Sequence, residues 1–340
     1  MEAHNIPQLS ILPYKWPEHP LWEIENIKLC PDLLDVKKNK TNSLALKTMF
    51  IEHQNEQHSH SIAIYTDGSK SENGVGCSAV TQNRTIKNKL PSNASVFTAE
   101  LYAILAILTT ILPNNNNTFV IYSDSQSALK AITDYTSKHP IVMKIHNWLV
   151  HLFTKHKEVS FCWVPSHINI QGNELADKAA KEAAEAANDP IIFKQIPHKD
   201  YYAMIRSILL TDWQSNWNSV NHNKLRTVKD SIKPWTSSSN KARRIEVILT
   251  RLRIGHTLIT HRHLMEGRPA PYCEDCLVPL TVEHFLVECP TYIDERRRIF
   301  NLRVGESVDV KQFLAPPYNN KFTIKNLIKY LRTIDIFDKI

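Results

Sequence analysis

The sequence predicts an α/β domain with a mixed five-stranded sheet and helices on both faces, followed by a mainly helical C-terminal region. Two observations predict this fold class. Residues 61–187 contain three strand-like runs in series and then helix, strand, helix, helix, strand and helix patterns, an order typical of a mixed sheet covered by helices. Residues 191–340 show apolar spacing that is mainly helical. A length of 340 residues allows about two domains.

Residues 1–60 are predicted to be an N-terminal linker with one helix. Four prolines, Pro7, Pro13, Pro17 and Pro20, favour extended and irregular backbone at the start. A partial apolar stripe predicts a helix over residues 43–54. The polar run 53–60 contains three histidines and is predicted to be a solvent-exposed loop, because its histidines show no ligand pattern with other donors.

The predicted helices and strands of residues 61–187 follow from runs of apolar residues and from the residues that interrupt these runs. Ser95 is a candidate N-cap for a long helix, which Pro113 and the asparagine run 114–117 end. Pro140 suits the first turn of another helix. The predicted strands are 62–67, 74–81, 84–90, 119–123 and 159–164, and the predicted helices are 95–112, 125–133, 140–156 and 172–187.

Residues 188–190, Asn-Asp-Pro, mark the predicted boundary before the third region, residues 191–340. Helices are predicted there near 200–217, 241–253 and 322–333. Residues 188–340 carry 24 Lys and Arg against 16 Asp and Glu, whereas residues 61–187 carry 11 against 10. The basic excess therefore lies in the C-terminal part, which favours a polyanionic partner there over a merely solvated surface.

Other patterns exclude whole classes of protein. No apolar run reaches the roughly 18 residues of a membrane span. The first residues do not form a secretory signal, so we expect an intracellular protein, in the nucleus or cytoplasm. Disulfides are not expected in such a compartment, and Cys30, Cys77 and Cys162 are predicted to be buried free thiols.

Four carboxylates stand out by their positions. Asp67 and Asp124 each end an apolar strand-like run, whereas Glu100 and Asp177 lie in helical patterns. Acids at strand ends and on neighbouring helices can converge at one edge of a sheet. Four converging carboxylates repel one another unless they hold cations, and two hard cations on oxygen ligands are a standard arrangement for phosphodiester cleavage.

The residues around these acids resemble the type 1 ribonuclease H domain. The segments are residues 65–69 (YTDGS), 98–101 (TAEL), 122–125 (YSDS), 163–167 (WVPSH) and 172–177 (GNELAD). The order Asp, Glu, Asp, Asp, with a histidine ten residues before the last Asp, is specific to that family. The resemblance implies an endoribonuclease that hydrolyses the RNA strand of RNA/DNA hybrids and leaves 5′-phosphate and 3′-hydroxyl ends.

The resemblance also implies roles for the acids. Asp67 would bridge two Mg²⁺ ions, for which Mn²⁺ can substitute. Glu100 and Asp124 would hold the ion on the leaving-group side, and Asp177 the ion that generates the attacking hydroxide. His167 matches the family's mobile-loop histidine, which shuttles a proton or assists product release; the alternative is a surface histidine.

The family reads RNA through its 2′-hydroxyl groups. Backbone groups near Gly68 and Ser69, with the Glu100 carboxylate, are the expected readers here. Ser125 and Gln126 are expected to contact the DNA strand. The chain lacks the basic helical handle of some cellular members, so we predict that the basic region 191–340 supplies the grip on the hybrid.

Cysteine and histidine also cluster near the C-terminus. Cys273, Cys276, His284 and Cys289 have the types and spacings of a structural Zn²⁺ site; the alternative is three reduced thiols and a core histidine. The surrounding sequence resembles the tail after ribonuclease H in insect-type non-LTR retrotransposon polyproteins, which implies a reverse transcriptase supplied separately. Arginines 243, 244, 251 and 253 either bind phosphates or form a solvated helix face.

Two other classes of function stay open. A co-opted remnant that binds hybrids without cutting them would keep the fold but not the activity. An integrase-like transposase is disfavoured, because that class carries three acids in a different order and spacing.

Overall fold

The computed structural model describes residues 10–15, 18, 20, 28–30, 42–186, 189–220, 223–235, 242–316 and 321–340. Pro7, Pro17 and Asn188, on which predictions were made, lie outside these residues. The chain divides into two compact units, Met1–Ile208 and Leu209–Ile340. No helix in the described ranges is long and apolar enough to cross a membrane.

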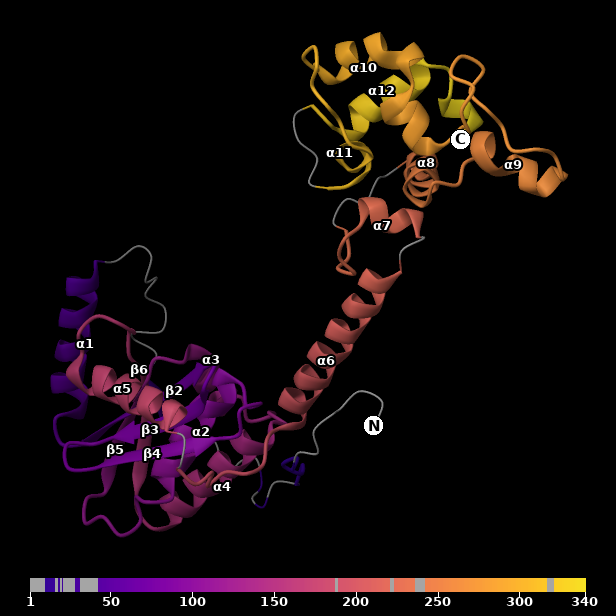
Figure 1. Ribbon diagram of the computed structural model, residues 1–340. Coiled ribbons are helices and arrows are strands. Elements are labelled where there is room, and N and C mark those ends of the chain that lie inside the picture. Colours follow the sequence, from indigo (N-terminus) through magenta and orange to yellow (C-terminus); the bar gives the residue numbers. More distant parts are fainter. Residues whose placement is uncertain are drawn as a thin grey trace. The chain divides into compact units, whose positions relative to one another are not determined.

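The first unit contains a mixed sheet (Figure 1). Its order is β1-β6-β5-β2-β3-β4. Strands β2, β3 and β4 form an antiparallel meander, and β1, β6, β5 and β2 are parallel to one another. The bounds are β1 Lys28–Cys30, β2 Ile62–Ser71, β3 Gly74–Val80, β4 Thr85–Leu90, β5 Thr118–Ser123 and β6 Glu158–Trp163.

The predicted α/β class is confirmed, but the sheet has six strands and not five. The added strand is β1, which pairs with β6 at the edge of the sheet. Three residues are too few to show an alternating pattern, so sequence periodicity could not reveal this strand. The register sets Cys30 opposite Cys162, and the structure joins these two residues in a disulfide with Cα atoms 5.0 Å apart. The expectation that both are free thiols is therefore wrong in this structure.

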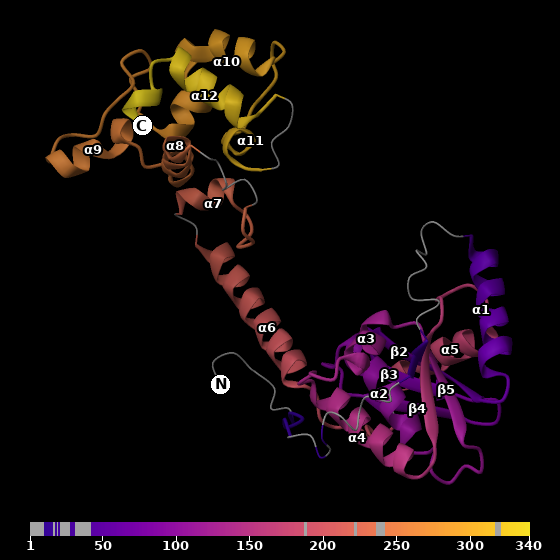
Figure 2. The ribbon, with the colours of Figure 1, turned by 180° about the vertical axis from the view of Figure 1, so that it is seen from behind.

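Helices cover both faces of this sheet, as Figures 1 and 2 show. They are α1 Ser43–His58, α2 Val96–Leu108, α3 Gln126–Thr133, α4 Pro140–Thr154 and α5 Gln171–Glu185. A Cβ at Gly68 would overlap the α2 backbone, whereas a Cβ at Gly76 would overlap the α5 backbone. Gly68 lies opposite Cys77 in the ladder, so Gly68 and Gly76 face opposite sides. These glycines let α2 and α5 approach the sheet closely.

Three predicted boundaries differ from the structure by four residues. Helix α1 continues through the polar run that was predicted to be a loop and ends at His58, because no glycine or proline interrupts it. Strand β2 extends past Asp67 to Ser71 and turns tightly into β3. Helix α2 ends at Leu108 and not at residue 112.

Residues 189–208 pack with the first unit. Asp200 is buried at the start of α6 (His198–Ser219) and accepts hydrogen bonds from the Ser95 backbone (2.9 Å) and the Thr98 hydroxyl (2.6 Å). Phe193 stacks on Tyr102 with ring centroids 4.4 Å apart. Asp200 thereby stabilises the first turn of α2, which is the helix that carries Glu100.

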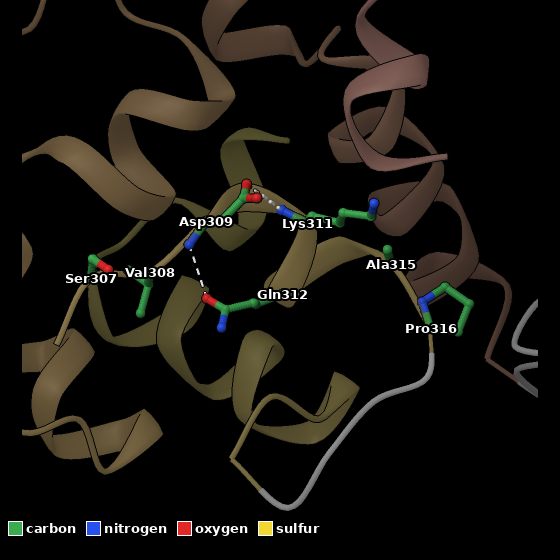
Figure 3. A pocket seen from close by; sticks show the side chains of 7 residues that line it. All are labelled: Ser307, Val308, Asp309, Lys311, Gln312, Ala315 and Pro316. Carbon is green, nitrogen blue, oxygen red and sulfur yellow. Dashed lines mark hydrogen bonds between the residues drawn. The ribbon is translucent and has the colours of Figure 1, made fainter. Parts of the chain in front are cut away.

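The second unit is helical around an aromatic core. Phe300 contacts the rings of Phe313 and Phe322. Its helices after α6 are α7 Lys224–Val228, α8 Arg243–Ile254, α9 Leu258–Glu266, α10 Ile293–Phe300, α11 Val310–Leu314 and α12 Ile324–Thr333. Asp309 and Gln312 form a reciprocal cap at the start of α11, and both line the pocket in Figure 3.

The arginines of α8 are mostly engaged within the unit. Arg253 is buried, donates to the Leu314 carbonyl (3.0 Å) and lies over the Trp235 ring. Arg251 donates to the Ile340 carbonyl (2.5 Å), and Arg244 pairs with Asp338. Arg251 and Arg253 therefore join α8 to other parts of the second unit, which neither sequence alternative anticipated, whereas the pair of Arg244 and Asp338 is exposed, as a solvated helix face would be.

Candidate functional site

Three of the four predicted acids meet at one edge of the sheet. Strands β2 and β5 are parallel with Thr66 opposite Ser123, so the residues that follow, Asp67 and Asp124, lie side by side. Glu100 approaches from α2, and the missing Cβ of Gly68 makes room for that helix. Ligand oxygens of Asp67, Glu100 and Asp124 all lie within 4.8 Å of one another.

The electrostatics of this cluster are unfavourable without cations. Asp67 and Glu100 are only 6% and 5% exposed. Burial, and then the charges of Asp124 and Asp177, raise the pKa of Asp67 to about 7. Burial, and then Asp67 and Asp124, raise the pKa of Glu100 well above its ordinary value. Burial and mutual repulsion therefore both disfavour negative charge on Asp67 and Glu100.

One oxygen of Glu100 is buried without a hydrogen-bond partner among the described residues, although the Gly68 backbone bonds the carboxylate. Buried polar atoms are otherwise almost always paired. Hard divalent cations take carboxylate oxygens as ligands. The convergence, the repulsion and the unpartnered oxygen therefore fit a site for hard divalent cations.

Asp177 belongs to a neighbouring group of side chains. Its carboxylate lies with His167 and Glu174, with ligand atoms within 4.8 Å of one another. Asp177 also pairs with Lys181, one helical turn further along α5, at 2.7 Å. Its charge still reaches Asp67, whose pKa it raises. The structure thus sets Asp177 beside the main cluster of three acids.

His167 lies on an exposed loop between β6 and α5 and has a positive φ of 58°. Such backbone is uncommon for a residue with a side chain. Glu174 is on the first turn of α5 and faces the same group. The structure thus brings Glu174, which lies in the 172–177 segment of the family resemblance, next to His167 and Asp177.

The residues predicted to contact substrate lie next to the acids. Gly68 and Ser69 continue β2 beyond Asp67. Ser125 is the N-cap of α3, and its hydroxyl accepts from the Ala128 backbone at 3.3 Å. Gln126 is the first residue of that helix and is half-buried. Gly68 packs closely on α2, so the fold requires a glycine at this position whether or not its backbone contacts a substrate.

Two supporting residues escaped the sequence analysis. Trp163, the last residue of β6, donates its indole N–H to the Asp124 carbonyl at 3.1 Å and so fixes the backbone of that acid. The positive charge of Lys181 lowers the pKa of Asp67 and so partly offsets the effects of burial, Asp124 and Asp177. The spacing of four residues between Asp177 and Lys181 on a helix was the available signal.

The C-terminal cysteines and His284 also converge. The Cys289 sulfur lies 3.9 Å from that of Cys273 and 3.7 Å from that of Cys276. A tetrahedron with Zn–S bonds of about 2.3 Å has edges of about 3.8 Å. His284 Nε2 is buried without a hydrogen-bond partner among the described residues, and Nδ1 lies 3.5 Å from Glu288.

The thiols of this cluster influence one another. Burial acts against ionisation of Cys273, but hydrogen bonds from the Cys276 backbone and the nearby His284 imidazole lower its pKa to about 7. Burial and then the two neighbouring thiols raise the pKa of Cys276 to about 12. One thiolate is thus favoured and further ones are opposed, unless a cation compensates their charge. The donor set and its spacing fit tetrahedral Zn²⁺.

Comparisons with known proteins find similarity to a segment of the first unit. Residues 59–185 match the family model for RNase H. Pol polyproteins of equine infectious anemia virus, strain Wyoming and isolate 1369, are each 36% identical over 135 residues, 37% of this chain. The aligned part spans 11% of those polyproteins. A crystal structure of RNase H1 from Halobacterium salinarum NRC-1 is 24% identical and covers 36% of this chain and 96% of that chain, with a TM-score of 0.29. Residues 59–185, within the six-stranded unit, are thus similar in sequence to RNase H.

Proposed function

We propose that the protein is an endoribonuclease that hydrolyses the RNA strand of RNA/DNA hybrids and leaves 5′-phosphate and 3′-hydroxyl ends. The observation that carries the proposal is the convergence of Asp67, Glu100 and Asp124 at one sheet edge within a segment that matches RNase H. The hybrid as substrate and the reaction come to this chain from that family match. The buried, mutually repelling carboxylates supply the reason for divalent cations.

The four acids divide into two groups of ligands in this proposal. Asp67 belongs to the group with Glu100 and Asp124, and the charge of Asp177 also reaches it, so Asp67 would help to hold both of two Mg²⁺ ions. When bound, the ions activate a water and neutralise charge on the scissile phosphate and the leaving 3′ oxygen. Trp163 holds the Asp124 backbone in place through its 3.1 Å hydrogen bond.

Other side chains would handle protons and substrate. His167, exposed beside Asp177, would accept or return a proton and assist product release. Glu100 and the backbone at Gly68 and Ser69 would contact a 2′-hydroxyl of the RNA. Ser125 and Gln126, at the start of α3, would contact the DNA strand. Lys181 would give up Asp177 when cations bind, because its ion pair and the cation compete for one carboxylate.

We also propose a structural Zn²⁺ on Cys273, Cys276, His284 and Cys289. It is supported by sulfur separations near a tetrahedral edge and by the unpartnered Nε2 of His284. Glu288 would orient the imidazole, as carboxylates commonly do for metal-bound histidine.

The biological setting is inferred from the same resemblances. The chain would be the downstream part of a polyprotein of the insect-type non-LTR retrotransposon class, working inside the cell, in nucleus or cytoplasm, with a reverse transcriptase supplied separately. The second candidate, a hybrid-binding remnant without activity, would keep the same surface. The four acids are all present, which favours the enzyme.

A cleavage assay tests the proposal. A hybrid with labelled RNA, the matching single-stranded RNA and the matching RNA duplex are incubated with the protein and Mg²⁺. We expect cutting of the hybrid alone, with products that a 5′-phosphate-dependent exonuclease degrades. Tight hybrid binding without cutting would favour the remnant instead. Products with 3′-phosphate ends would reject the two-cation chemistry.

A further inference from the structure

A second group of metal-ligating side chains lies in the first unit, where β1, β6 and α1 meet. Cys30 of β1 and Cys162 of β6 are opposite each other in the parallel ladder. His58 Nε2 lies 3.2 Å from the Cys30 sulfur and 3.4 Å from the Cys162 sulfur. His53 completes the group: donor atoms of Cys30, His53 and His58 are all within 4.8 Å of one another.

This arrangement contradicts the expectation that the histidines of residues 53–60 are solvent-exposed and unrelated to other donors. His53 and His58 are half-buried, and their ring centroids are 5.4 Å apart. Cys162 is fully buried and Cys30 is half-buried. The sequence concealed the group because Cys162 lies 132 residues from Cys30 and 104 residues from His58.

The composition and spacing of the group match a known class of metal site. Cys₂His₂ zinc sites take two cysteines and two histidines, with three to five residues between the histidines. Here the cysteines come from neighbouring strands, and four residues lie between the two histidines on the helix. With Zn–S near 2.3 Å and Zn–N near 2.0 Å, tetrahedral sulfur and nitrogen ligands are separated by about 3.5 Å. The observed 3.2 and 3.4 Å are close to this value.

A disulfide alone does not account for the histidines. It uses the two sulfurs and requires no imidazole, yet both histidines of the helix end converge on the same place. We propose that, when Cys30 and Cys162 are thiols, these four side chains bind one Zn²⁺ that fixes β1 and α1 to the sheet. The disulfide and the zinc complex are then two forms of one cross-link, and the redox state selects between them.

Conversion between the two forms balances as follows. A phosphine reductant and one water convert the disulfide into two thiols and a phosphine oxide. Each thiol then loses its proton as its sulfur bonds Zn²⁺, while both imidazoles bind in their neutral form. The site is next to the proposed active site along β6, because Cys162 precedes Trp163, whose indole bonds the Asp124 carbonyl.

Metal analysis of the full chain, purified with a phosphine reductant and dialysed after Zn²⁺ addition, tests the proposal. We expect His58→Ala and Cys30→Ser each to lose about one equivalent of zinc relative to the unaltered protein. His60→Ala, at an exposed histidine two residues away, should lose none. Cys276→Ser, in the C-terminal cluster, should lose its zinc independently, so that Cys276→Ser combined with His58→Ala loses two.

Co²⁺ substitution provides a readout that does not depend on counting zinc. The thiolate-to-cobalt absorption of the Cys276→Ser protein should disappear with the added Cys30→Ser, whereas far-UV circular dichroism in chelator stays unchanged. Equal zinc content in the unaltered, His58→Ala and Cys30→Ser proteins would overturn the proposal. So would a peptide map that still links Cys30 to Cys162 after reduction, with no zinc bound in the first unit.

Discussion

The proposed metal site predicts that one of its own ligands destabilises the metal-free protein. The substitution is Asp67→Asn, which removes a charge and nearly keeps the shape. The pKa of Asp67 rises from 3.8 to about 7 on folding. This shift of about three units corresponds to about 4 kcal/mol, at about 1.4 kcal/mol per unit. The buried amide must itself find hydrogen bonds, so we expect a net gain in the free energy of unfolding of about 2–4 kcal/mol at pH 8.

The sign of the pH dependence follows from the raised pKa. Below pH 3.8 the carboxyl of Asp67 is protonated in both the folded and the unfolded chain, so it costs nothing. Between 3.8 and about 7 the unfolded chain releases the proton while the folded one keeps it, and the destabilisation grows with pH until it levels off above 7. The advantage of Asp67→Asn should therefore shrink to under about 1 kcal/mol near pH 4.

Urea unfolding in chelator at pH 8 and pH 4 measures both values. Glu72→Gln, at an exposed acid on the turn after β2, is the matched control and should change stability by less than about 0.5 kcal/mol. Mg²⁺ at about a hundred times its dissociation constant should stabilise the unaltered protein by about 2.7 kcal/mol and Asp67→Asn far less. The reasoning is refuted if Asp67→Asn is no more stable than the unaltered protein at pH 8, or if its advantage persists at pH 4.

Three further predictions follow from the site and the second unit. His167→Ala should lower the cleavage rate while Mg²⁺ still stabilises the protein, because His167 lies outside the group of Asp67, Glu100 and Asp124; loss of the Mg²⁺ effect in thermal melts would make it a ligand. Cys276→Ser should lower the melting temperature of residues 209–340 and leave the rate of hybrid cleavage by the first unit unchanged; an unchanged melting temperature in both zinc and chelator would show that the cluster has no structural role. Truncation after Ile208, which retains the Asp200 cap on α2, should weaken hybrid binding and flatten its dependence on salt; equal affinity and slope would show that the basic region does not contact the hybrid.

Local patterns in the sequence predicted most helices and strands of the first unit and the positions of the acids on them. The ends of the runs before Asp67 and Asp124, and the N-cap at Ser95, anticipated the sheet edge and the helix that carries Glu100. The family resemblance singled out His167 and Asp177 ten residues apart in the sequence, and the structure brings their side chains together.

Features that depend on long-range pairing could not be predicted in this way. Strand β1 has three residues and exists because β6 offers it an edge. The charge of Arg253 suggested a position on the surface, but its guanidinium is buried, donates to the Leu314 carbonyl and lies over the Trp235 ring. Cys30, His58 and Cys162 meet only after the sheet has formed, so no spacing in the sequence indicated their convergence.

The most direct test of the central claim is the single-turnover cleavage of an RNA/DNA hybrid at enzyme excess with Mg²⁺, for the unaltered protein and for Asp124→Asn. The carboxylate of Asp124 lies beside that of Asp67, and its backbone carbonyl accepts a hydrogen bond from the Trp163 indole. We expect the unaltered protein to cut the RNA strand and Asp124→Asn to leave it intact while binding the hybrid. An intact hybrid with the unaltered protein, or equal cutting by both, would contradict the account.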